Sequence, residues 1–328
     1  YALQANTTAS YNTADGYGVL AANTTGCTNT AVGSNALEAN TTGCCNVALG
    51  YKALQSGTTH DHNVAVGYSA LRVDTTGSSN TAVGYSALDK NTTAHNNTAI
   101  GSLAMCDNTT GTLNVAVGTN GLHKNTTGSY NNSFGAYALQ TNTTGTLNNA
   151  FGYGALEVNT TGGQNSAFGH ASLNANTTGT YNTASGYRAL VANTTGGCHT
   201  AIGNQALAAN TTGVENMAVG YHALKLNTTG QQNTASGNYA LDSTTTGSHN
   251  VAVGYKTLCA NTTACLNTAI GYGAMIAITT GQCNVAVGRG SGPSSAALDN
   301  TIAIGHCATV TASNSTVIGN TSTTSTTI

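Results

Sequence analysis

The sequence predicts an all-β fold, a parallel β-solenoid or β-roll, and three observations support this. A block that begins Asn-Thr-Thr-Gly and continues Asn-Thr-Ala-Val-Gly-Tyr recurs with a strict 17-residue period, in seventeen copies without insertion or deletion. A glycine stands at the same place in every copy, from Gly16 to Gly288. The repeat is also too short, and too rich in Gly, Asn and Thr, to supply two useful helices. Seventeen rungs of short strands, each stacked on its neighbours, satisfy all three observations.

Each 17-residue rung contains two short apolar groups. In the copy from Asp74 to Leu88, Thr-Ala-Val lies just before the fixed glycine, and Ala-Leu lies three to four residues after it. We expect both groups to be strands and the glycine to form a corner, since glycine reaches positive φ at no steric cost. Neighbouring strand residues face opposite sides, and both sides are apolar here. We therefore expect one side to pack inside the rung, and the alanine side to pack against another copy of the chain or another layer.

The repeat divides the chain into three parts. Residues 1–288 form the array of 17-residue rungs, 289–298 are a Gly/Ser/Pro linker or an altered rung, and 299–328 carry shorter rungs and a tail. In the last part, two apolar blocks that end in glycine, at 300–305 and 314–319, follow each other with a 14-residue spacing. The strands are therefore expected to form the framework, with Asn-Thr-Thr-Gly as a loop carried on it.

The C-terminal blocks Ile302-Ala303-Ile304-Gly305 and Val317-Ile318-Gly319 resemble the head repeat of trimeric autotransporter adhesins and of related viral or phage fibre proteins. The resemblance is specific over 299–320 and extends, as Ala-Val-Gly and Ala-Ile-Gly blocks, over the 17-residue copies. It implies a left-handed parallel β-roll with three chains side by side, and an adhesive or structural surface fibre. It carries over no catalytic residue.

Charge and hydropathy exclude several classes of function. Charged residues make up 5% of the chain and the formal net charge is -2, so the basic surface that nucleic acid binding requires is missing. The chain has no run of about 18 apolar residues, and we expect no membrane span. Ten acidic residues over seventeen rungs leave little for acid-base catalysis, so we expect neither an enzyme nor a cofactor. The chain opens at Tyr1, part-way through a repeat, and we interpret it as a piece of something longer.

Asparagine opens most rungs and forms the N-glycosylation sequon Asn-Thr-Thr in thirteen of the seventeen copies. The candidate glycosylation sites are Asn6, Asn23, Asn40, Asn91, Asn108, Asn125, Asn142, Asn159, Asn176, Asn193, Asn210, Asn227 and Asn261. The alternative is a turn asparagine whose side chain bonds the backbone two residues on. A glycosylated row would coat one side of each chain with sugar.

The Thr-Thr pair is unbroken from Thr7 to Thr280 and predicts two parallel threonine ladders. Three roles stay open for them: hydroxyls that bond along the stack, O-linked glycosylation, and ice binding by a flat threonine array. Tyrosine follows the fixed glycine in about half of the copies, and we expect it at the surface.

Cysteine and histidine predict one candidate disulfide and no metal site. Cys27 and Cys44 lie one period apart, hence on adjacent rungs with Cα atoms about 5 Å apart, which is compatible with a disulfide. The chain has no Cys-x-x-Cys pair, so no zinc site is expected. We interpret His60-Asp61-His62 as part of a solvated loop.

Together these features predict a non-enzymatic structural fibre that is extracellular, at a cell or virion surface, and coated with covalent glycans. We expect the chain to associate with copies of itself, as a trimer by the resemblance, and a longer filament stays open. The alternatives are a receptor-binding viral or bacterial fibre, and an ice-binding protein that uses the Thr-Thr ladders.

Overall fold

The computed structural model describes residues 1–323, which contain no helix. The chain forms two compact units, Tyr1–Gln164 and Asn165–Ile328. Each unit is a parallel β-solenoid whose strands recur with the 17-residue period of the sequence, so the predicted fold class is confirmed. Residues 324–328, the end of the predicted part 299–328, lie outside the described residues.

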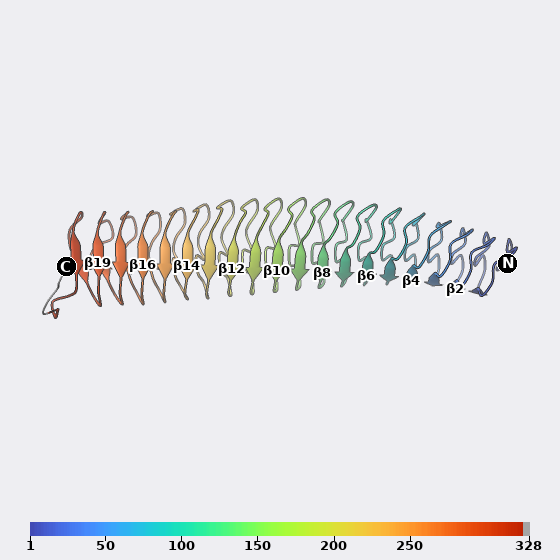
Figure 1. Ribbon diagram of the computed structural model, residues 1–328, viewed down its shortest axis with the longest axis horizontal. Coiled ribbons are helices and arrows are strands. Elements are labelled where there is room, and N and C mark those ends of the chain that lie inside the picture. Colours follow the sequence, from blue (N-terminus) through green and yellow to red (C-terminus); the bar gives the residue numbers. More distant parts are fainter. Residues whose placement is uncertain (324–328) are drawn as a thin grey trace. The chain divides into compact units, whose positions relative to one another are not determined.

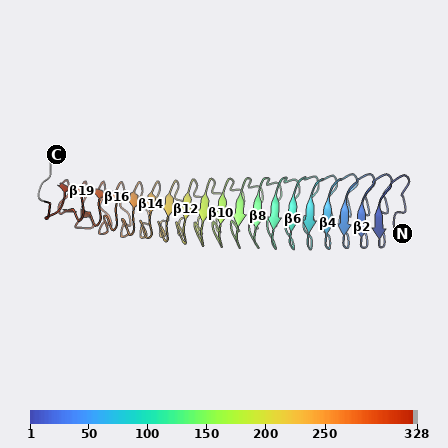
Figure 2. The same cartoon turned by 60° about the horizontal axis from the view of Figure 1, so that its bottom comes forward.

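Each 17-residue rung contributes one three-residue strand, and the strands of a unit pair in parallel in chain order (Figure 1). The strands of the first unit are β1 (Thr13–Asp15), β2 (Thr30–Val32), β3 (Val47–Leu49), β4 (Val64–Val66), β5 (Thr81–Val83), β6 (Thr98–Ile100), β7 (Val115–Val117), β8 (Asn132–Phe134) and β9 (Asn149–Phe151). Those of the second unit are β10 (Ser166–Phe168), β11 (Thr183–Ser185), β12 (Thr200–Ile202), β13 (Met217–Val219), β14 (Thr234–Ser236), β15 (Val251–Val253), β16 (Thr268–Ile270), β17 (Val285–Val287), β18 (Gly292–Pro293), β19 (Ile302–Ile304), β20 (Thr309–Val310) and β21 (Thr316–Ile318). Figure 2 shows these strands side by side within each unit, with loops that complete each rung.

The interior of each unit is a thin column of alanine and leucine side chains. In the rung that begins at Asp74, Ala82 at the centre of β5 and Leu88 are both fully buried. Leu88 belongs to the Ala-Leu group, which was predicted to be a second strand and instead lies in a turn. Its φ of 51° is in the left-handed region, which costs a leucine roughly 1–2 kcal/mol. Full burial of the side chain contributes about 1.5–3 kcal/mol, so burial decides the backbone here and the strand prediction was wrong.

The fixed glycine forms the corner that the sequence predicts. Gly84 has φ 138°, and a Cβ on it would lie 2.5 Å from the carbonyl oxygen of Gly101, the corner glycine of the next rung. Both the backbone conformation and the close approach of the two rungs therefore require glycine.

Residues 289–298 are an altered rung and not a linker. The N–H of Gly290 donates to the carbonyl of Tyr272 on the preceding rung, and the N–H of Gly292 donates to the carbonyl of Ala308 on the following one. Strand β18 pairs with β20 as a separate two-stranded sheet. In the main sheet, Ile302 of β19 pairs with Thr316 of β21, and this 14-residue step confirms the predicted shorter rungs.

Candidate functional site

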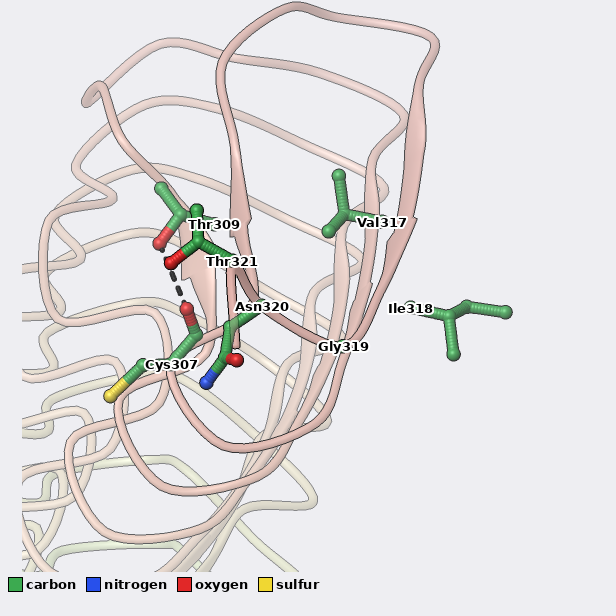
Figure 3. Close-up of a pocket in the computed structure, with 7 residues that line it drawn as sticks. All are labelled: Cys307, Thr309, Val317, Ile318, Gly319, Asn320 and Thr321. Atoms are coloured by element: carbon green, nitrogen blue, oxygen red, sulfur yellow. Dashed lines mark hydrogen bonds between the residues drawn. The ribbon is translucent and has the colours of Figure 1, made fainter. Parts of the chain in front are cut away.

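The outer face of the sheet in each unit carries a largely apolar column, formed by the third residue of each three-residue strand and interrupted by Asp15, Ser185 and Ser236. The central alanine points into the coil, so the first and third residues point outward. Figure 3 shows this alternation in β21, where Val317 points into the coil and Ile318 points away from it. We call the third residues the outer column: Val32, Leu49, Val66, Val83, Ile100, Val117, Phe134 and Phe151 in the first unit, and Phe168, Ile202, Val219, Val253, Ile270, Val287, Ile304 and Ile318 in the second.

The outer column corrects the expectation that the alanine side packs against another copy. The strand-centre alanines from Ala31 onward are fully buried inside the coil, whereas twelve of the outer-column side chains are between 36% exposed, as at Phe151, and 43% exposed, as at Ile202. The reason is size, because the strand centre holds alanine, or serine in β8, in every three-residue strand except β21, where the larger Val317 is only partly buried. A lateral partner that packs on the strands must therefore contact the outer column and not the alanines.

The sequon asparagines lie inside the coil, where they form a hydrogen-bonded ladder. The side-chain Nδ2 of Asn125 donates to Oδ1 of Asn108 at 2.8 Å and to the carbonyl of Gly128 at 2.9 Å. Twelve of the thirteen candidates are fully buried, namely Asn23, Asn40, Asn91, Asn108, Asn125, Asn142, Asn159, Asn176, Asn193, Asn210, Asn227 and Asn261. An N-glycan would be attached to this same Nδ2, and the folded interior has no room for it. Asn6 on the first rung is exposed and keeps the prediction.

A second asparagine ladder supports the first. The N–H of Asn131 donates to Oδ1 of Asn114 at 2.9 Å, and the Nδ2 of Asn131 donates to the carbonyl of Gly145 on the next rung at 2.9 Å. That same carbonyl accepts a bond at 3.0 Å from the sequon residue Asn142. Buried amides satisfied in this way hold the loop to the strands and fix the register of adjacent rungs.

The two threonine ladders differ in what their hydroxyls do. The first threonine of each pair is used along the stack, as where Thr126 Oγ1 donates to the carbonyl of Thr143 at 3.0 Å. The second threonine, such as Thr127 or Thr144, is exposed. The structure thus supports the stacking role for the first ladder and leaves one outward column of hydroxyls, which is half of the array that the ice-binding alternative expects.

The tyrosines after the corner glycine are exposed, as predicted, and stack along the surface. The ring of Tyr68 lies 5.2 Å from that of Tyr51 and 5.4 Å from that of Tyr85, and Tyr255 stacks on Tyr272 at 5.3 Å. Offset stacking at this spacing stabilises adjacent rungs by about 0.5–1.5 kcal/mol per pair.

Cys27 and Cys44 meet as their spacing predicts. Their Sγ atoms lie 3.0 Å apart, and both are free thiols in this structure. The disulfide itself therefore stays a prediction, which oxidation of the protein would test.

His60 is buried, so its interpretation as part of a solvated loop was wrong. His60 takes the place of the usual glycine, and Gly57 takes the place of the usual asparagine. The imidazole of His60 fills the space that the asparagine side chain occupies on other rungs. On the next rung Asp74 replaces the asparagine, and its Oδ2 lies 3.9 Å from His60 Nδ1. Neither ring nitrogen of His60 has a hydrogen-bond partner within residues 1–323. The sequence could have indicated this buried pair, because residues 57, 60 and 74 all differ from the usual residue of the repeat.

A second group of titratable residues was not identified from the sequence, where no metal site was expected. Cys106, Asp107 and His123 place one thiol, one carboxylate and one imidazole together, with their ligand atoms all within 4.8 Å of one another. Cys106 and His123 are one repeat period apart, so they occupy the same place on adjacent rungs. That spacing could have identified them.

The end of the second unit is hollowed, next to a cysteine–histidine contact. Its lining consists of Cys307, Thr309 and residues 317–321 (Figure 3). Beside the lining, Cys307 Sγ lies 3.5 Å from His306 Nε2, and the same ring nitrogen lies 3.2 Å from Arg289 Nη1.

Within residues 1–323 no helix is long and apolar enough to cross a membrane. No known family matches the sequence, and no curated protein matches it.

Proposed function

We propose that this chain is a non-enzymatic structural fibre of an extracellular surface, which associates side by side with further copies of itself through the outer column. The single observation that supports the proposal most is this column, because twelve of its aliphatic or aromatic side chains are exposed. A contiguous apolar strip of this kind is typical of a protein-protein contact surface.

The chemistry of the outer face suits association between identical chains. Apart from Asp15, the strands within residues 1–323 contain no charged residue, so two copies can approach without burying charge. The rings of Phe134 and Phe151 lie parallel, with centroids 4.8 Å apart, and form a flat apolar surface. The resemblance to trimeric adhesin heads suggests three chains as the number, and this trimer is part of the proposal.

The assignment of a mechanical function relies on how the rungs are held together. Backbone bonds, two asparagine ladders and one threonine ladder all run from rung to rung, as in Thr126 N–H to Thr143 carbonyl at 2.9 Å. Pulling along the stack must therefore break many bonds at once. Titratable groups are few, with ten acidic residues and nine histidines in the whole chain, which supports a structural over a catalytic function.

The proposal can be tested with outer-column variants. Each exposed side chain contributes about 1 kcal/mol if association buries its remaining surface, so three changes should cost about 3 kcal/mol and weaken association roughly hundredfold. Ile100→Ser, Phe134→Ser and Phe151→Ser are suitable because Ser185 and Ser236 occupy the same place on other rungs. Sedimentation equilibrium of the full chain should show an oligomer for the native protein and a monomer for the triple variant at the same concentration.

Three exposed leucines of the loops provide the matched control. Leu113, Leu147 and Leu266 are 44%, 46% and 55% exposed, but they lie on the loop and not on the sheet. Their substitution by serine should leave the oligomer intact. A native protein that is monomeric at every concentration, or a control triple variant that dissociates equally, would refute association through the outer column.

A further inference from the structure

A mixed cluster of metal-binding side chains joins two adjacent rungs of the first unit. Cys106 and Asp107 end the rung that begins at Asn91, and His123 lies near the end of the next one. The N–H of Asp107 donates to the carbonyl of His123 at 2.9 Å, which holds the two backbones in register. We propose that Cys106, Asp107 and His123 bind one transition-metal ion of the zinc class, a site beyond the structural function proposed above.

The donor set suits such an ion. Thiolate, imidazole and carboxylate are the ligands that zinc takes in proteins, at about 2.0–2.3 Å from the metal. A tetrahedral site then places its donor atoms roughly 3.3–3.8 Å from one another. The donor atoms here already lie within 4.8 Å, so side-chain rotations that close them by about 1 Å complete three corners of a tetrahedron. A water molecule would take the fourth corner, as in zinc sites with three protein ligands.

A divalent cation at this place has to displace the proton of the Cys106 thiol. Burial, and then the nearby Asp107 and Asp89, raise the pKa of the Cys106 thiol to about 11, so without metal the thiol is protonated. Burial also lowers the pKa of His123, which keeps its imidazole neutral and able to ligate at pH 7. Binding of the ion displaces one proton from Cys106, and the dication, the thiolate, the Asp107 carboxylate and the Lys90 ammonium bonded to it then carry a net charge of +1.

The neighbouring ion pairs leave the site available. Arg72 Nε donates to Asp89 Oδ1 at 2.8 Å, so that pair is matched within itself. Lys90 Nζ donates to Asp107 Oδ1 at 2.8 Å, which orients the carboxylate and leaves its second oxygen for a metal. Cys106 is only 8% exposed and belongs to neither ion pair. Its thiol is therefore not needed to balance the charges of these neighbours.

The position that Cys106 and His123 share in the repeat varies among the rungs, so substitutions there can test metal binding without disturbing the fold. The same position on other rungs holds Glu38, Gln55 and Gln140, among others. His123→Gln therefore reproduces a native arrangement one rung away, and Cys106→Ser removes the thiol without creating bulk. Neither change should affect folding.

The experiment titrates the reduced full-length chain with Co²⁺ and then displaces it with Zn²⁺. We expect one Co²⁺ per chain, an ultraviolet thiolate-to-cobalt charge-transfer band, and an affinity that rises up to tenfold per pH unit as one proton is released. Cys106→Ser should abolish the band, and His123→Gln should weaken Co²⁺ binding at least tenfold. Zn²⁺ should raise the thermal midpoint of the native protein but not that of Cys106→Ser.

Two control variants separate this site from other thiols. Cys44→Ser removes the Cys27–Cys44 pair, which could hold a soft metal, and His249→Gln removes an exposed histidine of the second unit. Both should bind Co²⁺ as the native chain does. A band that survives Cys106→Ser, a band abolished by Cys44→Ser, or no binding at all would overturn the site.

Discussion

The buried pair of His60 and Asp74 predicts a pH dependence that is hidden in the native protein and visible in variants. Both side chains are fully buried, and Asp74 Oδ1 accepts a 2.8 Å bond from Asn91 Nδ2. Burial lowers the pKa of His60 from 6.5 to about 4, although the charge of Asp61 opposes this shift. Burial raises the pKa of Asp74 from 3.8 to about 7, although bonds from Asn91 and the Gly77 N–H oppose it.

The two shifts act in opposite directions on stability. The folded state keeps the Asp74 proton that the unfolded chain loses, so this residue lowers the free energy of unfolding as pH rises from 3.8 to about 7. His60 stays neutral in the folded state while the unfolded chain binds a proton, so this residue raises the free energy of unfolding as pH rises from about 4 to 6.5. Between about pH 4 and 6.5 the two slopes cancel, and the pair should give the native protein a flat profile.

Removing one partner should expose the slope of the other. Asp74→Asn restores the usual asparagine and leaves His60, so the free energy of unfolding should rise by about 3 kcal/mol from pH 4 to 6.5. The double variant Gly57→Asn, His60→Gly restores the usual rung and leaves Asp74, so this free energy should fall by about 4 kcal/mol from pH 4 to 7. The triple variant, which carries all three changes, should be flat and the most stable.

Urea denaturation of the four proteins, followed by far-ultraviolet circular dichroism at several pH values, measures these profiles. The triple variant is the control for every titrating group outside the pair, because it retains all of them. Slopes of the same sign in the Asp74→Asn and double variants, or profiles that match the triple variant, would refute the assignment of shifted pKa values to buried groups.

Four further predictions concern the corners, the thiols and the loops. Gly84→Ala should cost about 1–3 kcal/mol or more in unfolding experiments, whereas Gly273→Ala should cost less, since no atom lies within 4 Å of its added Cβ. Mild oxidation should link Cys27 to Cys44 first, as peptide mapping would show; a different first disulfide would contradict the 3.0 Å contact. Intact-mass measurement before and after deglycosylation should reveal N-glycan at Asn6 or at no site, and sugar on buried sequons would contradict the asparagine ladder. Thermal hysteresis should be absent, because only the second threonine ladder is exposed; a clear activity would show that one ladder suffices.

Several elements could be read directly from the repeat. An unbroken 17-residue period forces every rung to follow the same backbone path, and a path shared by all rungs can only be stacked. The corner at Gly84 and the meeting of Cys27 with Cys44 follow from that stacking alone, and both are found. The proximity of Cys106 to His123 follows from it equally, since these two residues are one period apart.

The sequence by itself therefore determined the period, the parallel stacking, the corner glycines and the shortening of the last rungs. Only the tertiary structure decided which side of each strand faces inward, because alanine and the larger apolar residue beside it are both hydrophobic, and hydropathy cannot rank them. The size of the side chain decides which residue faces inward once the coil closes. In β5 the small Ala82 is buried inside the coil, and the larger Val83 lies on the outer face. Closure of the coil also places the sequon asparagines inside. Their side chains form hydrogen bonds to the neighbouring rung in place of the hydrogen bonds to water that an exposed loop would make.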